Sequence, residues 1–119
     1  MIGELVPLVL IPRYTSFVGA NEFTTTPFDA ADFSTGSVRL WRGALLGTDS
    51  PTFLAFFETS NDKVVWTPQN PSGDDPGANS AMPITLALGR RWLRVRVVLT
   101  GTNPAVTCMC AGTLTRRVR

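Results

Sequence analysis

The chain reads Arg91-Trp92-Leu93-Arg94-Val95-Arg96-Val97-Val98-Leu99 at its most regular stretch. Apolar side chains recur there at every second position, namely Leu93, Val95, Val97 and Leu99. A period of two places these side chains on one face of an extended strand, with Arg94 and Arg96 on the other face. The stretch therefore predicts a half-buried β-strand and an all-β fold around it.

A cluster of turn-forming residues, Gly101-Thr102-Asn103-Pro104, follows this strand, and residues 105–115 then alternate again. Two alternating runs joined by such a cluster are typical of a β-hairpin. We therefore expect a long C-terminal hairpin. Its pairing would bring Arg90 and Arg91 beside Thr115 and Leu114, close to the arginines that follow.

A second hairpin is predicted from residues 37–46 and 52–59, joined by Gly47-Thr48-Asp49-Ser50-Pro51. This connecting segment is a near copy of residues 101–104. The similarity indicates either an internal repeat or two unrelated hairpins of the same design. Residues 53–57 are apolar on both faces, which is typical of a central strand between two layers.

The remaining segments complete the predicted architecture. Residues 64–67 and 84–88 are candidate strands, and residues 68–83 form a long loop rich in proline and glycine. Seven or eight short strands with polar turns predict an antiparallel β-sandwich of about eight strands. We expect residues 1–32 to form an extended N-terminal arm and edge strand, since Pro7 and Pro12 disfavour a central strand. Residues 33–119 would be the β-sandwich domain.

The composition excludes several kinds of chemistry. The 119 residues include ten arginines, one lysine, two cysteines and no histidine. Without histidine, Ser-His-Asp catalysis and His-ligated metal sites are excluded. Cys108 and Cys110 lie two apart in a predicted strand, where a relaxed disulfide is disfavoured, so we expect two free, buried thiols. We predict no catalytic residue, no cofactor, no metal site and no enzymatic activity.

Membrane insertion is also disfavoured by the sequence. The apolar run at residues 5–11 is interrupted by Pro7 and preceded by Glu4. It lacks the basic region and the small-residue cleavage site of a signal peptide. The apolar runs are also shorter than the roughly 20 residues of a membrane helix. We therefore expect no membrane contact and synthesis in a reducing cytoplasm.

Charge is divided unevenly along the chain. Residues 1–89 contain four basic and nine acidic residues, whereas residues 90–119 contain seven arginines and no acid. These arginines repel one another unless anions compensate them. The anions would come from acids of the same chain, from an acidic surface of a neighbouring protein or from nucleic acid; the net charge of +2 disfavours the last. The candidate partner-binding residues are Arg90, Arg91, Arg94, Arg96, Arg116, Arg117 and Arg119.

Three weaker patterns have structural explanations that compete with functional ones. Asp74 and Asp75 lie among glycines and prolines, which favours a turn over a calcium site. Glu58 and Asp62 have the side chains of a catalytic carboxylate pair, but nothing in the sequence specifies their separation. The three tryptophans, at positions 41, 66 and 92, fit core or interface positions better than a sugar-stacking platform.

Five stretches together resemble small β-sandwich proteins encoded among the virion structural genes of tailed bacteriophages. They are residues 33–41, 51–53, 58–66, 91–94 and 104–107, which read FSTGSVRLW, PTF, ETSNDKVVW, RWLR and PAVT. Some members of this group are head decoration or minor capsid proteins. The resemblance covers residues 33–117, and Lys63 stands where glycine is common. Residues 1–30 match no part of the pattern, and we expect them to reach a neighbouring subunit.

The resemblance implies a non-enzymatic structural protein of the virion. We expect a capsid decoration protein, of the cement or minor capsid type, that binds major capsid subunits as a homo-oligomer, a trimer or a dimer. It would be made in the host cytoplasm and lie on the capsid surface. Two alternatives remain open: a carbohydrate- or receptor-binding module of the tail or baseplate, and a ring subunit of the tail or connector.

Overall fold

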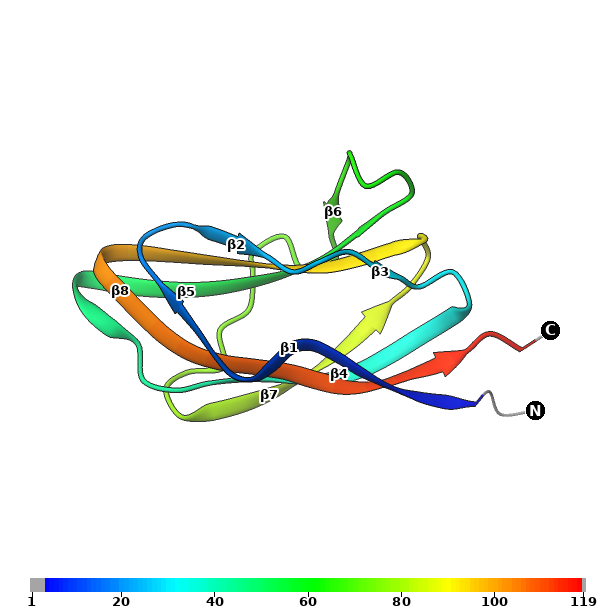
Figure 1. Ribbon diagram of the computed structural model, residues 1–119, viewed down its shortest axis with the longest axis horizontal. Coiled ribbons are helices and arrows are strands. Elements are labelled where there is room, and N and C mark those ends of the chain that lie inside the picture. The colour runs from blue at the N-terminus through cyan, green and yellow to red at the C-terminus, as the bar shows by residue number, and fades with distance from the viewer. Residues whose placement is uncertain (1–3, 119) are drawn as a thin grey trace.

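The computed structural model describes residues 4–118, in which eight strands form one antiparallel sheet. The sheet is strongly curled, like half a barrel (Figure 1). The prediction of an all-β, antiparallel fold with about eight strands is confirmed. The predicted β-sandwich would have two sheets, whereas these strands are hydrogen-bonded into one. The strands are β1 (Leu5–Val18), β2 (Glu22–Thr24), β3 (Phe28–Asp29), β4 (Phe33–Arg42), β5 (Leu46–Ser60), β6 (Thr67–Pro68), β7 (Ser80–Ala87) and β8 (Trp92–Arg116).

Strand β8 is the centre of the sheet. It is 25 residues long and bends near Gly101, so that its two parts lie in opposite halves of the molecule (Figure 1). Strands β4 and β5 follow one another along one side of β8, and β1, β2 and β3 follow one another along the other side. We call the part with β2, β3, β5 and β6 the β5 half, and the part with β1, β4 and β7 the β4 half.

Both predicted hairpins are wrong. The two parts of β8 pair with different strands: Leu93 pairs with Thr59 of β5, whereas Leu114 pairs with Gly36 of β4. Strands β4 and β5 likewise pair with β8 and not with each other. The glycine-rich clusters are corners at which a strand bends within the sheet. Residues that favour positive φ fit a bulged corner as well as a reverse turn, so the sequence alone did not distinguish these corners from hairpin turns.

The two similar clusters form a single shared corner. Thr48 of β5 pairs directly with Thr102 of β8, whose hydroxyl donates to the carboxylate of Asp49. A Cβ on Gly47 would lie 3.0 Å from the carbonyl oxygen of Thr102, and one on Gly101 would lie 3.0 Å from the carbonyl oxygen of Thr48. Two adjacent strands that bend at the same place need the same backbone freedom, and this need accounts for the similar sequences.

The N-terminal segment belongs to the sheet over its described residues. Strand β1 pairs with β8 from Leu5 opposite Thr115 to Val18 opposite Ala105, and β2 and β3 continue the pairing. The predicted edge strand is present, since β8 is the one strand with which β1 pairs in the described chain. The expected strand at residues 64–67 is reduced to β6, and the long loop ends where β7 begins at Ser80. Residues 4–118 include no helix with the length and hydrophobicity of a membrane span.

The core lies inside the curl and follows the predicted alternation. Leu93, Val95 and Val97 are buried on the inner face of β8, where Val95 lies directly beside the buried Phe57 of β5. Cys108 and Cys110 are free and buried, as expected. Burial raises the pKa of each thiol to about 12, and for Cys110 the nearby sulfur of Cys108 adds to this effect.

These thiols are expected to be unreactive in the native protein. Because only the thiolate is nucleophilic, a pKa near 12 leaves roughly one thiol in 10⁴ ionised at pH 8. Iodoacetamide should therefore label neither cysteine in native protein and both in guanidinium, as read by mass spectrometry of the intact chain. Native labelling at the rate of the unfolded chain would contradict this picture.

A buried arginine holds the long loop against the sheet. Arg42, at the end of β4, donates from Nε to Asp75 Oδ1 at 2.6 Å and from Nη2 to Asp75 Oδ2 at 3.1 Å. Its Nη1 donates to the carbonyl of Gly43 at 3.0 Å. Burial alone would raise the pKa of Asp75, but the bonds from Arg42 and the Gly77 N–H, with the charge of Arg42, hold it below its ordinary value.

This pair gives a pH-dependent contribution to stability. Because the pKa of Asp75 is lower in the folded chain than in the unfolded chain, its contribution is complete above the ordinary aspartate pKa of about 3.9. The contribution is lost as the pH falls through the lowered value. We expect Asp75→Asn to unfold at lower urea than wild type at neutral pH, with a difference that shrinks below about pH 4. A difference that stays constant to pH 2 would contradict the assignment.

Candidate functional site: the outer faces of the sheet

Two arginines of the candidate set converge on one buried carboxylate. Glu58 of β5 lies directly opposite Arg94 of β8 and is 3% exposed. Its Oε1 accepts from Arg94 Nε at 2.9 Å, and its Oε2 accepts from Arg96 Nε at 3.2 Å. The alternation that sends the neighbouring Phe57 into the core sends Glu58 outward, and the two arginines cover it. One carboxylate thus compensates two cations.

Aromatic rings extend this cluster over the outer surface of the β5 half, which we call the arginine face. The guanidinium carbon of Arg94 lies 4.2 Å from the ring centre of Trp66, and that of Arg96 lies 4.2 Å from the ring centre of Phe56. The ammonium of Lys63 lies 4.2 Å from the ring centre of Trp92. Such cation–π contacts hold the cations in fixed positions.

Two further ion pairs on the arginine face involve exposed carboxylates. Arg96 Nη1 is 2.9 Å from Glu22, and Arg91 Nη2 is 3.0 Å from Asp29. The hydrogen bond from Arg91, with one from the Ala31 N–H, holds the pKa of Asp29 below its ordinary value. Exposed pairs of this kind contribute little to stability but fix the positions of the side chains.

The two ends of β8 lie at the same end of the molecule, opposite the shared corner (Figure 1). The Ala30 N–H donates to the carbonyl of Arg91, and the Arg117 N–H donates to the carbonyl of Asp32. Because Ala30 and Asp32 are only two residues apart, they hold the ends of β8 within about 15 Å of one another. The predicted gathering of arginines at one end is therefore present among the described residues. It results from the bend of β8 and not from hairpin pairing between its two parts. We call this region, which contains Arg90, Arg91, Arg116 and Arg117, the basic end.

Of the six candidate arginines that the structure describes, four have carboxylate partners within residues 4–118. Arg91, Arg94 and Arg96 are described above, and Arg116 lies 3.3 Å from Glu4. Two others bond to neutral oxygens: Arg90 Nη1 donates to Thr59 Oγ1, and Arg117 Nη2 donates to the carbonyl of Phe33. Arg119 lies outside the described residues. Acids of the N-terminal half thus supply much of the compensating charge.

The outer surface of the β4 half has the opposite character. We call it the threonine face. It consists of four rows that cross the strands, each taken in the order β7, β4, β8 and β1, together with Tyr14, which contacts Trp41 of the fourth row. The rows are Ala87, Thr35, Thr115 and Leu5; Thr85, Ser37, Thr113 and Pro7; Pro83, Arg39, Ala111 and Val9; and Ala81, Trp41 and Met109. Arg39 is the only charged side chain among these sixteen described positions. Average composition would place about four charges there.

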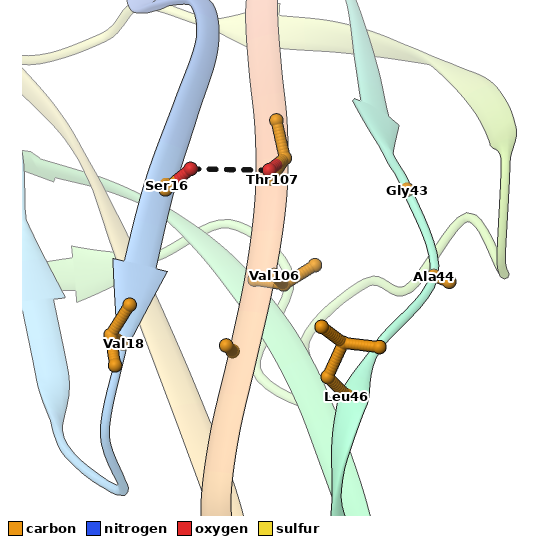
Figure 2. Close-up of a pocket in the computed structure, with 8 residues that line it drawn as sticks. Ser16, Val18, Gly43, Ala44, Leu46, Val106 and Thr107 are labelled. Carbon is orange, nitrogen blue, oxygen red and sulfur yellow. Dashed lines mark hydrogen bonds between the residues drawn. The ribbon is translucent and has the colours of Figure 1, made fainter.

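A shallow groove continues this face toward the shared corner. Figure 2 shows Val18 of β1 and Leu46 of β5 on either side of β8, with the Ser16 hydroxyl 3.2 Å from that of Thr107. Val18 and Leu46 are 70% and 62% exposed. The groove has a volume of about 320 Å³. It is large enough for a few side chains of a partner protein.

Exposed apolar side chains concentrate on this continuous surface. Eight large hydrophobic residues are exposed in the described chain, and five of them belong to the threonine face or its groove: Leu5, Val9, Tyr14, Val18 and Leu46. Sequence reasoning missed this surface because β1 is apolar on both faces and gives no alternation. The threonines recurring at positions 107, 113 and 115 were the available signal, since they mark the outward side of β8.

The weaker candidates do not assemble into sites. Asp62 accepts from the N–H groups of Val64 and Val65 at 2.8 and 3.0 Å, so it caps a turn, while Glu58 is held by arginines. Trp41 lies on the threonine face and the other two tryptophans contact cations of the β5 half, so the three rings do not share one surface. Residues 4–118 contain no group of three side chains able to hold a metal ion.

Comparisons with known proteins add no family. No family model matches the chain, and no curated protein matches it.

Proposed function

We propose that the chain is a non-enzymatic structural protein of a tailed-phage virion, a capsid decoration protein that binds major capsid subunits. The proposal begins from the five stretches that resemble such proteins, four of which lie wholly or largely in β4, β5 and β8. It places the protein on the capsid surface after synthesis in the host cytoplasm. It includes assembly as a homo-oligomer.

The observation that carries this proposal is the threonine face. With strands about 4.8 Å apart and a rise of about 3.3 Å per residue, its rows and groove cover roughly 700 Å². Burying the apolar part of this area contributes about 25 cal/mol per Å² before the costs of ordering are subtracted. A surface of this size with one charge is typical of a protein that functions in contact with other subunits.

The basic end is the part of the molecule proposed to face capsid carboxylates. Arg90 and Arg117 bond to neutral oxygens and form no ion pair within residues 4–118, so their charges are proposed to meet an acidic partner. Arg116 is paired with Glu4, but both side chains are exposed and can exchange partners. Charges at the rim of an interface steer association and fix orientation. Arg94 and Arg96 have a different role here, because Glu58 holds them within the fold.

We also propose that the fold is a β-sandwich. Decoration proteins of the resembled group are β-sandwiches. The bend of β8 and β5 turns the inner surfaces of the two halves toward one another around a common core. This arrangement supports a sandwich-like description, in which the shared corner joins the two layers.

Charge reversal at the basic end tests the proposal. We expect the double variant Arg116→Glu and Arg117→Glu to bind purified heads at least tenfold more weakly than wild type, because it replaces two cations by anions. The control variant Arg13→Glu reverses an exposed arginine that belongs neither to the basic end nor to the threonine face. Binding is measured by co-sedimentation, and thermal unfolding checks that each variant is folded.

Location in the virion provides a second test. A gold label attached through a cysteine introduced at Ala78, in the loop before β7, should appear on heads in electron micrographs of virions. Label confined to tails would contradict the decoration assignment and favour a tail or connector subunit. Absence of label from all virions would contradict the virion assignment itself.

A further inference from the structure

We propose that the threonine face is a homodimer interface, packed against the same face of a second copy across a twofold axis. The inference deepens the proposed function by naming the occupant of this face, and only the dimer's role in the virion rests on that function. The dimer itself follows from the charge, exposure and edges of the β4 half.

A partner for this half must approach its face and not its edges. The outermost strands of the β4 half are β1 and β7, and each contains a proline, Pro7 and Pro83. Proline has no N–H, so it interrupts the hydrogen bonding that an added strand would need. The exposed side chains of Leu5, Val9 and Tyr14 lie on the face itself. Face-to-face packing of two sheets covers such side chains.

The polar groups of the face suit a second copy. Threonine and serine hydroxyls both donate and accept hydrogen bonds, so a hydroxyl-rich surface is complementary to itself. The face has no acid among its sixteen described positions, so a twofold contact buries no carboxylate. The one cation, Arg39, needs a neutral partner on the second copy. The face and its groove together cover roughly 700 Å², which is close to the 800 Å² per partner of a standard interface.

The single charge specifies the position of the axis. Arg39 and Trp41 lie in adjacent rows of β4. We place the twofold axis in the plane of the interface, perpendicular to the strands and midway between these two rows. Rotation about this axis exchanges the rows, so each Arg39 lies opposite Trp41 of the partner copy. A guanidinium over an indole ring is a favourable contact that needs no acid. The arginine face and the shared corner's outer loop at Asp49 remain outside this contact.

The test compares two arginine insertions by sedimentation. Ala111 lies in the third row of the threonine face, and Ala78 lies in the loop before β7; both are exposed. Wild type should sediment at twice the mass of the 12.9 kDa chain. Ala111→Arg, which places a second cation beside Arg39, should raise the dissociation constant roughly 100-fold, a change of about 2.7 kcal/mol. Ala78→Arg should leave it unchanged.

A second pair of variants tests the arginine–tryptophan contact. Arg39→Ala should weaken the dimer about fivefold, and Arg39→Lys should recover part of the loss. A monomeric wild type at 100 µM, a trimer, or a dimer that Ala111→Arg leaves intact would each overturn the proposal. Circular dichroism melts confirm that every variant is folded. A monomeric wild type that still binds heads would reject this inference alone, whereas a wild-type dimer that fails to bind heads would reject the virion role alone.

Discussion

Gly112→Ala is expected to lower the free energy of unfolding by about 4 kcal/mol or more, so that the protein unfolds at far lower urea than wild type. A Cβ at this position would lie 2.0 Å from the Ser37 carbonyl oxygen and 2.6 Å from the Val38 Cα. Both are backbone atoms of β4, which is paired with β8 there, so no side-chain rotation relieves the overlap. The strands must separate, at a cost of about 4 kcal/mol or more from a typical total of 5–15 kcal/mol.

Urea unfolding followed by tryptophan fluorescence measures this loss. Gly89→Ala is the matched control, because a Cβ there meets nothing within 4 Å. It should be neutral or stabilise the fold by a few tenths of a kcal/mol, since alanine restricts the unfolded chain. A Gly112→Ala protein that unfolds at the wild-type urea concentration would show that β4 and β8 are not in such close contact.

Glu58→Gln is expected to have the second-largest effect. It removes the carboxylate that Arg94 and Arg96 share, and leaves two partly buried cations beside each other. Breaking a buried pair by deleting one partner typically costs 3–5 kcal/mol, and we expect about 3 kcal/mol because the arginines retain some solvent contact. The measurement is the free energy of unfolding in urea at neutral pH.

Glu22→Gln separates burial from charge. Glu22 contacts the same Arg96, but its side chain is 60% exposed. Its loss should therefore cost no more than about 0.5 kcal/mol and should vanish in high salt. Equal effects of the two substitutions would mean that the Glu58 cluster is solvated and adds no more than an ordinary surface pair.

The local character of each segment was predictable from the sequence, but the pairing of segments was not. Alternation correctly identified the buried side of residues 91–99, because burial on one face requires a period of two whatever strand lies alongside. Gly101 and Asn103, both at positive φ, suit a corner as well as a turn. Only the partners across the sheet distinguish the two outcomes, and those partners lie 40 or more residues away in sequence.

The candidate site was predictable in the same partial way. Arg94 and Arg96 were assigned to the outer side of their strand, and the structure places them there. Their partner was not recognised, because the register that sets Glu58 opposite Arg94 depends on the bend shared by β5 and β8. The threonine face was missed for a related reason: it is assembled from four strands, and no single strand carries enough of it to be conspicuous.

The central position of β8 also determines when the protein can fold during its synthesis. Strands β1 to β5 are made first, and each of them pairs with β8. Strands β4 and β5 also pair with β7 and β6, but β1, β2 and β3 have no other partner among the described strands. The nascent chain therefore exposes apolar strands until residues 92–116 leave the ribosome. Long-range pairing of this kind forms slowly and leaves the chain open to aggregation meanwhile. The protein is therefore expected to depend on chaperones at birth, and to fold in one late, cooperative step.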